Sequence, residues 1–288
     1  MRSSNPVFNK RREFATFGQP GQFQQGQNTP YGQPGFGQPQ EGYQQPGGPQ
    51  GPLGHDYSRP QPAAAAMTID DVVMRTGMLF AVLLAAAALT WGGVAFGVIP
   101  APAIMPLWLV TMLVALGLGL YIQMGRTIRP PLMFVYAGLE GAFIGLISVV
   151  FESIYPGIVF TAVLATLGAF AAMLVAYKVG AIRATPKFTR FLIIAGAGYF
   201  IFAMLNLVSS MVFGFSAFYD TGLLGLAITL FGVGLASLFL ILDFNQIEEG
   251  IANRMPEQYA WLCAFGLMVT LVWLYIEMLR LISILRGD

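Results

Sequence analysis

The chain has 288 residues, of which 56% are hydrophobic and only 10% are charged, and its formal net charge is +1. This balance excludes an ordinary soluble domain and a broad basic surface for nucleic acid, and it predicts an integral membrane protein. The single cysteine, Cys263, excludes an internal disulfide, and its apolar neighbours favour a buried thiol. The only histidine, His55, lies in a polar stretch, which excludes histidine-based metal or nucleophile sites in the hydrophobic part.

Residues 1–66 form a unit of their own. A short basic start is followed by a Gln/Gly/Pro tract punctuated by Phe and Tyr. Such a segment buries too little apolar surface to offset its ordering entropy, so we predict a disordered cytoplasmic tail. The tail is either a tether that docks partners or a tolerated solvated extension. No apolar h-region precedes it, so we expect no cleavable signal peptide and an uncleaved first membrane helix.

Residues 67–288 are predicted to form the transmembrane domain. Thr68 and Asp71 supply capping-type residues just before the first hydrophobic window. Seven windows follow, each close to the roughly 20 residues that a helix needs to cross a bilayer of about 30 Å. They are Gly77–Val98, Ile104–Met124, Pro131–Val150, Ile158–Tyr177, Phe191–Phe213, Gly222–Leu242 and Tyr259–Leu285.

The positive charges predict the orientation. Lys and Arg gather in the tail and after the second, fourth and sixth windows, whereas the alternate loops contain none. Only Arg280 and Arg286 fall on the other side. The positive-inside rule therefore places the N-terminus in the cytoplasm and, with seven spans, the C-terminus outside. Small residues at Gly93-x3-Gly97 and Gly141-x3-Gly145 are spaced for close helix packing.

Four polar residues in or beside the windows are candidate functional residues: Glu140, Asp243, Glu277 and Arg126. A charge near the middle of a bilayer costs at least about 2.5–3.5 kcal/mol on insertion scales, so it rarely lacks a role. At 1.5 Å per residue, Asp243 and Arg126 are expected near the cytoplasmic boundary, and Glu140 about 14 Å above it. Glu277 reaches the level of Glu140 if its helix enters the bilayer near Gly266, and lies further out if it enters earlier.

Carboxylates in this setting suggest proton and cation chemistry. Two buried carboxylates that share a site can hold one proton between them. After losing it they repel one another or accept a hard cation such as Ca²⁺, so protons and cations compete. Glu277 can instead pair with Arg280 at i,i+3. Asp243 can be an interfacial acid on a helix that continues to Gly250, and Arg126 an orientation anchor.

Catalysis is not expected. No nucleotide-binding loop, zinc-protease motif or aspartyl-protease signature surrounds these acids, although an acid pair by itself is also compatible with an aspartyl protease. No internal repeat of a secondary transporter is visible either.

Two motifs occur in the last two windows: Leu-Ile-Leu-Asp-Phe-Asn-Gln-Ile at 240–247 and Leu-Tyr-Ile-Glu-Met-Leu-Arg-Leu-Ile at 274–282. They resemble the Bax-inhibitor-motif transmembrane family, whose penultimate helix ends in Asp-x-x-x-Ile and whose last helix has Leu-Tyr-Leu-Asp-x-x-x-Leu. The opening MRSSNPVFNK and Tyr-Ala-Gly-Leu-Glu-Gly-Ala-Phe at 136–143 resemble its bacterial branch. The resemblance covers most of residues 70–288.

The resemblance implies a seven-helix bundle whose last helix is central and wrapped by the other six. It also implies a pH-sensitive Ca²⁺ leak channel with an aspartate dyad, which falls on Asp243 and Glu277, and an arginine that corresponds best to Arg126. The chain departs from this pattern because the second acid is Glu and the connection between the two acids is longer than usual. Either residues 248–266 fold back along the interface, or Glu140 replaces Asp243 as the partner of Glu277.

We therefore expect a multi-pass protein of the bacterial inner membrane that acts as a pH-sensitive Ca²⁺/cation leak channel. Asp243, Glu277 and Glu140 would sense protons or cations, with Asp243 and Glu277 as Ca²⁺ ligands and Arg126 as a counter-charge. No cofactor is expected besides Ca²⁺ as the transported or bound ion. Two alternatives remain: a non-conducting regulator that binds a membrane AAA protease or another membrane protein, and a proton-coupled transporter.

Overall fold

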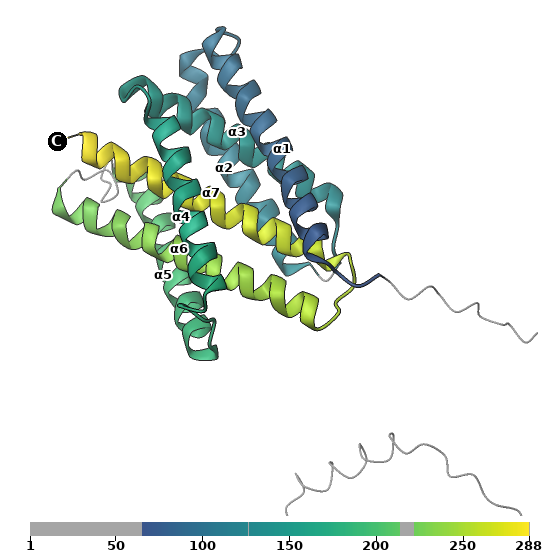
Figure 1. Ribbon diagram of the computed structural model, residues 1–288. Coiled ribbons are helices and arrows are strands. Elements are labelled where there is room, and N and C mark those ends of the chain that lie inside the picture. The colour runs from purple at the N-terminus through teal and green to yellow at the C-terminus, as the bar shows by residue number, and fades with distance from the viewer. Residues whose placement is uncertain (1–64, 126, 214–221, 288) are drawn as a thin grey trace, which may run out of the picture. The chain divides into compact units, whose positions relative to one another are not determined.

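The computed structural model describes residues 65–125, 127–213 and 222–287, in which seven long helices follow one another (Figure 1). Each is long and apolar enough to cross a membrane. The predicted all-helical, seven-span protein is therefore confirmed for this part of the chain, and the tail at 1–66 lies outside it except for its last two residues. The helices are α1 (Ile69–Ala95), α2 (Ala101–Met124), α3 (Pro130–Ile154), α4 (Ile158–Lys178), α5 (Pro186–Phe213), α6 (Leu223–Ala252) and α7 (Tyr259–Arg286).

Most helix ends agree with the hydrophobic windows, and the two large differences lie where polar residues continue a helix. α1 begins at Ile69 because Thr68 and Asp71 form a capping box, in which each side chain accepts the other residue's backbone N–H at 3.2 and 2.9 Å. α6 runs to Ala252, ten residues past the predicted Leu242. Its last turns are polar, but residues such as Gln and Glu are good helix formers, so hydropathy alone ended the window too early.

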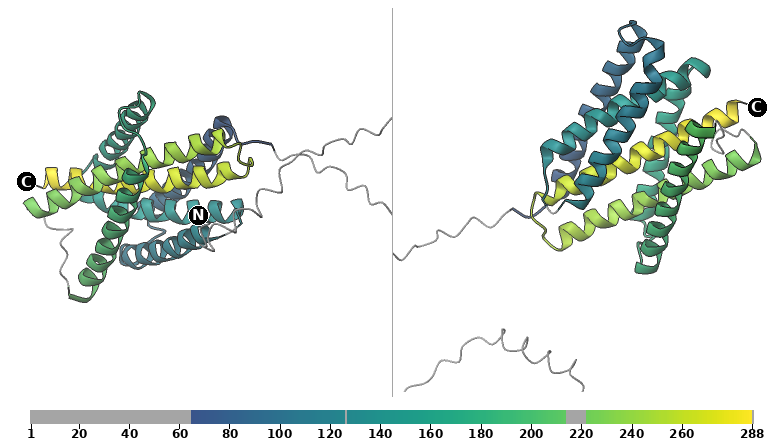
Figure 2. Two further views of the ribbon diagram at one scale, coloured as in Figure 1. Left: turned by 90° about the horizontal axis from the view of Figure 1, so that it is seen from below. Right: turned by 180° about the vertical axis from the view of Figure 1, so that it is seen from behind.

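The C-terminal helix α7 lies at the centre of the bundle, as predicted. Two thirds (67%) of its most apolar stretch is buried, against 11% for α2 and for α5. It packs against α1, α3, α4 and α6, whereas α2 packs on α3 and α5 packs mainly on α6. Figures 1 and 2 show α6 and α7 side by side and antiparallel over most of their length.

α1 and α3 make a very close contact through one of the predicted glycine pairs. A Cβ at Gly141 would collide with the Leu83 carbonyl of α1, and a Cβ at Gly145 would lie 2.7 Å from the Ala87 carbonyl oxygen. The two backbones touch there, as the small-residue spacing predicts. The same prediction is wrong for Gly93 and Gly97, because Gly97 follows the end of α1 at a positive φ of 73°.

The outer helices expose many large apolar side chains. Leu107 and Leu120 of α2, Phe160 of α4 and Ile201 and Leu205 of α5 all lie open to the surroundings. In water such a surface would be an aggregation liability, whereas a bilayer covers it at no cost. This distribution supports a multi-pass membrane protein.

Candidate functional site

Glu277 lies on α7 in the interior of the bundle and is only 2% exposed. Its Oε1 accepts hydrogen bonds from the Tyr199 hydroxyl of α5 at 2.8 Å and from the Trp273 indole at 3.2 Å. Its Oε2 accepts from Arg280 at 3.0 Å in an ion pair one turn along the same helix. The predicted i,i+3 pair is thus present, and two further donors satisfy the carboxylate.

A glycine on the neighbouring helix makes room for this group. A Cβ at Gly232 of α6 would lie 2.7 Å from Oε2 of Glu277 and would also collide with the Tyr199 hydroxyl. The Tyr199 ring packs against Trp273 with ring centroids 5.7 Å apart. The Tyr199 hydroxyl also accepts a hydrogen bond from Arg280 at 3.4 Å. The carboxylate of Glu277 is therefore buried between α5, α6 and α7 and is paired with Arg280.

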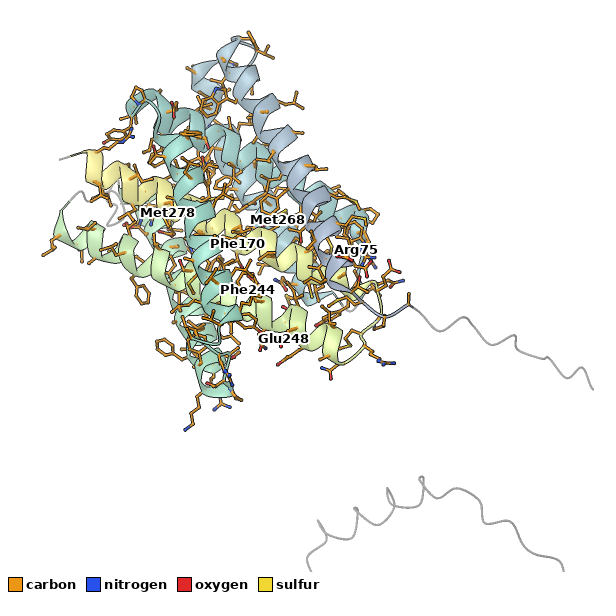
Figure 3. All side chains as sticks on the ribbon, viewed as in Figure 1. Arg75, Phe170, Phe244, Glu248, Met268 and Met278 are labelled. Atoms are coloured by element: carbon orange, nitrogen blue, oxygen red, sulfur yellow. The ribbon has the colours of Figure 1, made fainter. Side chains whose placement is uncertain are left out.

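Asp243 lies on α6 against the first half of α7. A Cβ at Gly266 would lie 3.4 Å from its Oδ1, and Thr270 and Cys263 of α7 also neighbour the carboxylate. Its Oδ2 is buried and accepts no hydrogen bond from the described residues. The next residue, Phe244, packs against Phe170 of α4 at 5.7 Å (Figure 3), so α4 covers this side of α6.

Asp243 and Glu277 do not meet. Gly232 faces Glu277 and Gly266 faces Asp243, so the two antiparallel helices place the acids eleven residues apart along each helix. At 1.5 Å per residue, this separates the two carboxylates by about 16 Å along the helices. One Ca²⁺ requires oxygen ligands at about 2.3–2.6 Å. In this arrangement the two carboxylates are too far apart to bind one ion together, and their roles as Ca²⁺ ligands stay a prediction.

The course of residues 248–266 shows how the chain connects the two acids. Residues 248–266 do not fold back along the interface: they form the end of α6, a short connection and the start of α7. Asp243 and Glu277 thus lie at different levels, as the sequence suggested. Residues 248–266 do not bring them together by folding back along the interface.

Glu140 of α3 does not replace Asp243 as the partner of Glu277. It interacts with Tyr136, one turn earlier on the same helix. Tyr136 packs against Phe265 at 4.9 Å and Ser148 bonds Tyr275 at 2.7 Å, so Glu140 lies near the level of Met268, which Figure 3 labels on α7. Glu277 therefore lies further along α7 than the level of Glu140, which agrees with the second of the two alternatives, because α7 begins at Tyr259 and not near Gly266. Arg126 lies outside the described residues.

No resident Ca²⁺ site is formed by the acids of the described residues, since no group of three or more His, Cys, Asp or Glu side chains could hold a metal there. Ca²⁺ takes six to eight oxygen ligands. The donors present do not fit a permanently bound ion.

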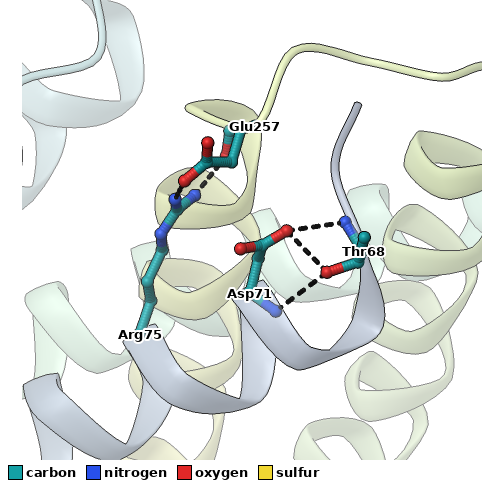
Figure 4. Close-up of polar contacts among 4 residues, drawn as sticks. All are labelled: Thr68, Asp71, Arg75 and Glu257. Carbon is teal, nitrogen blue, oxygen red and sulfur yellow. Dashed lines mark hydrogen bonds and ion pairs between the residues drawn. The ribbon is translucent and has the colours of Figure 1, made fainter. Parts of the chain in front are cut away.

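Two sets of contacts were not predicted from the sequence. Tyr199 and Gly232 complete the Glu277 site, and the only available signal was a tyrosine and a glycine in apolar helices. Arg75 of α1, which counted only as an orientation charge, forms an ion pair with Glu257 in the connection between α6 and α7 (Figure 4). These pairs join residues 78 and 182 positions apart, beyond the reach of any local pattern.

Comparison with known families supports the resemblance. No curated protein matches the chain. The family described as Bax inhibitor 1 like matches residues 5–287, which is nearly the whole sequence. The protein therefore belongs to the Bax inhibitor 1-like family and is a multi-pass membrane protein of that family.

Proposed function

We propose that the protein is a pH-sensitive cation leak pathway, with Ca²⁺ among the ions conducted, rather than an enzyme. The observation that carries this proposal is the buried Oδ2 of Asp243, which has no hydrogen-bond partner among the described residues. A buried carboxylate with an unused oxygen is costly when charged, unless a proton, water or a cation occupies it.

The direction of the pH effect follows from this competition. At low pH the carboxyl of Asp243 holds a proton, is neutral and tolerates its apolar surroundings. When the proton leaves, the charge has no permanent cation beside it, so water or a cation enters between α6 and α7. Cation flux should therefore rise as the pH rises through the midpoint of Asp243 and fall again on acidification.

The other candidate residues take different roles in this proposal. Glu277 is already neutralised by Arg280, so it stabilises the outer half of the α6–α7 pair. Glu140 is a second carboxyl group close to the level of Asp243 and is available to a passing cation. Arg126 is retained as a counter-charge. We place the protein in the bacterial inner membrane with its N-terminus in the cytoplasm, on the positive-inside rule.

Liposomes containing a Ca²⁺ dye test the proposal between pH 6 and pH 8. The wild type should conduct more at pH 8 than at pH 6, and Asp243→Asn should lose this dependence and conduct at the low-pH level throughout. Glu249→Gln is the matched control, because Glu249 is an exposed acid on the same helix. A pH profile of Asp243→Asn equal to the wild type would show that another group is the sensor.

The absence of wild-type flux at every pH would favour the second candidate, a non-conducting regulator that binds a membrane protease or another membrane protein. One observation favours that candidate: the segment that follows the predicted tail is bonded to the connection between α6 and α7. A partner of the tail would therefore act on the same pair of helices.

A further inference from the structure

The segment before α1 pairs with the connection between α6 and α7. The Met67 N–H donates to the Met255 carbonyl at 2.8 Å, and the Glu257 N–H donates to the Ala65 carbonyl at 2.8 Å. These two bonds form an antiparallel bridge between Ala66 and Pro256. The end of the predicted tail is thus bonded to a connection almost two hundred residues away.

Side-chain packing reinforces the bridge. Met67 is 2% exposed, and a Cβ added at Gly250 would lie only 2.6 Å from its Cε atom. Met67 and Val72 form a small buried cluster with Ile247, Ala260 and Cys263 of α6 and α7. Because Gly250 has no side chain, the methionine can lie directly against the last turn of α6.

An ion pair completes the contact. Arg75 is 8% exposed, and its guanidinium donates to both the backbone carbonyl and the carboxylate of Glu257, as Figure 4 shows. It also lies 5.2 Å above the Trp261 ring. The capping box of Thr68 and Asp71, in the same figure, fixes the first turn of α1 between the bridge and the arginine.

We propose that residues Ala65–Arg75, here called the strap, are a releasable fastening by which the N-terminal tail controls the α6–α7 pair. The strap crosses the connection at which α6 ends and α7 begins, and Asp243 lies seven residues before Gly250 on α6. While the strap is seated, the ends of α6 and α7 are held together. A force or a partner acting on the tail removes it and frees these ends to separate.

The contact is suited to release because it has few parts and the acid of its ion pair is exposed. The Glu257 side chain is 46% exposed, so water can replace the arginine as its partner. The bridge has two backbone bonds, and the strap contributes two buried apolar side chains, Met67 and Val72, to the small cluster beneath it. Local opening of such a unit can occur without unfolding the bundle, which the contacts of α7 with four helices stabilise.

The only cysteine of the chain reports directly on the strap. Cys263 is 3% exposed and lies in the cluster beneath Met67 and Val72. A water-soluble maleimide should label it slowly in the full-length wild type and at least about tenfold faster in Glu257→Gln or Met67→Ser, because removing a charged hydrogen-bond partner favours the open strap. Equal labelling rates would overturn the proposal.

Two controls separate strap opening from general destabilisation. Glu249→Gln removes a charge from the end of α6 at a side chain bonded only to Asn245 among the described contacts, and it should leave the labelling rate unchanged. Tyr275→Phe removes the buried bond to Ser148 and lowers overall stability, and it too should leave the rate unchanged. Acceleration in Tyr275→Phe equal to that in Glu257→Gln would mean that labelling follows global unfolding, which contradicts the strap.

A reversible lock tests the coupling to transport, and this step alone rests on the proposed function. Residues paired across an antiparallel bridge have Cα atoms about 4.5–5.5 Å apart, within the range of a disulfide. In a Cys263→Ser background, Ala66→Cys with Pro256→Cys should lower Ca²⁺ flux when oxidised and restore it on reduction. Equal flux in both states would refute the coupling, whereas a wild type without flux would refute the leak pathway and leave the labelling result standing.

Discussion

In each half of the α6–α7 pair, a carboxylate on one helix faces a glycine on the other, but only one of the two carboxylates is fully hydrogen-bonded. In the half near the end of α7, Glu277 of α7 faces Gly232 of α6, and in the half near the connection between the two helices, Asp243 of α6 faces Gly266 of α7. Glu277 receives three donors, including Arg280, whereas Oδ2 of Asp243 receives none from the described residues. Around Asp243, Thr270 of α7 is a hydrogen-bonding neighbour, but no cation and no donor to Oδ2 lies among the described residues, whereas α5 brings Tyr199 and α7 brings Arg280 to Glu277.

This comparison teaches that burial alone does not identify a sensing acid. A carboxylate whose charge is compensated within the fold gains little from a proton or a cation. One with an unused oxygen changes its surroundings when it titrates. Asp243 is therefore the acid expected to respond to pH, and Glu277 is expected to stabilise the bundle.

Removing Arg280 should have the largest effect. Arg280→Met leaves the buried Glu277 charge without its cation and should lower the free energy of unfolding by about 3–5 kcal/mol. Adding Glu277→Gln should recover a large part of this loss, and Asp243→Asn should cost almost nothing by comparison. Chemical unfolding in detergent measures all four proteins. An equal loss of unfolding free energy in Asp243→Asn and Arg280→Met would contradict the idea that only the charge of Glu277 is compensated within the fold.

The Tyr199 hydroxyl should matter less than the cation. Tyr199→Phe removes a hydrogen bond to a charged acceptor and should lower the free energy of unfolding by about 1.5–3 kcal/mol. Tyr275→Phe is the matched control, because its bond to Ser148 joins neutral groups and should be worth about 0.5–1.5 kcal/mol. The same unfolding measurement compares them, and equal losses would show that Tyr199 does not stabilise a charge.

The glycine opposite Glu277 offers the smallest and most local test. Gly232→Ala should displace both the carboxylate and the Tyr199 hydroxyl and should cost about 1–3 kcal/mol, as overpacking does. Gly234→Ala is the control, because no described atom lies within 4 Å of a Cβ at that position. Alanine there should be neutral or stabilising, since it is the better helix former. Equal melting temperatures for the two variants would contradict the close contact at Gly232.

Much of the fold could be predicted from the sequence because hydropathy is a local property. The seven windows, the capping box at Thr68 and the contact at Gly141 and Gly145 all follow from composition or short spacing. The family motifs at 240–247 and 274–282 added the central position of α7. The end of α6 was missed because its last turns are polar but helical.

The site could be predicted only in part. The pair of Glu277 with Arg280 is one helical turn apart and was anticipated, but Tyr199 comes from another helix. Which acids share a level depends on where each helix begins, and an error of a few residues moves a side chain by several ångströms. For this reason the level of Glu277 relative to Glu140 stayed open in the sequence, and the contact of Arg75 with Glu257 had no local signal.

The backbone contact between α1 and α3 has one further consequence. At Gly141 and Gly145 no side chain separates the two helices, so neither can roll about its own axis without a collision of main-chain atoms. These two helices therefore form a stationary half of the bundle. If the proposed leak pathway is correct, we expect the rearrangement that admits an ion to displace α6 or α7 relative to α1 and α3, and a pair of spectroscopic labels, one on α3 and one on α6, would register it as a change in their separation.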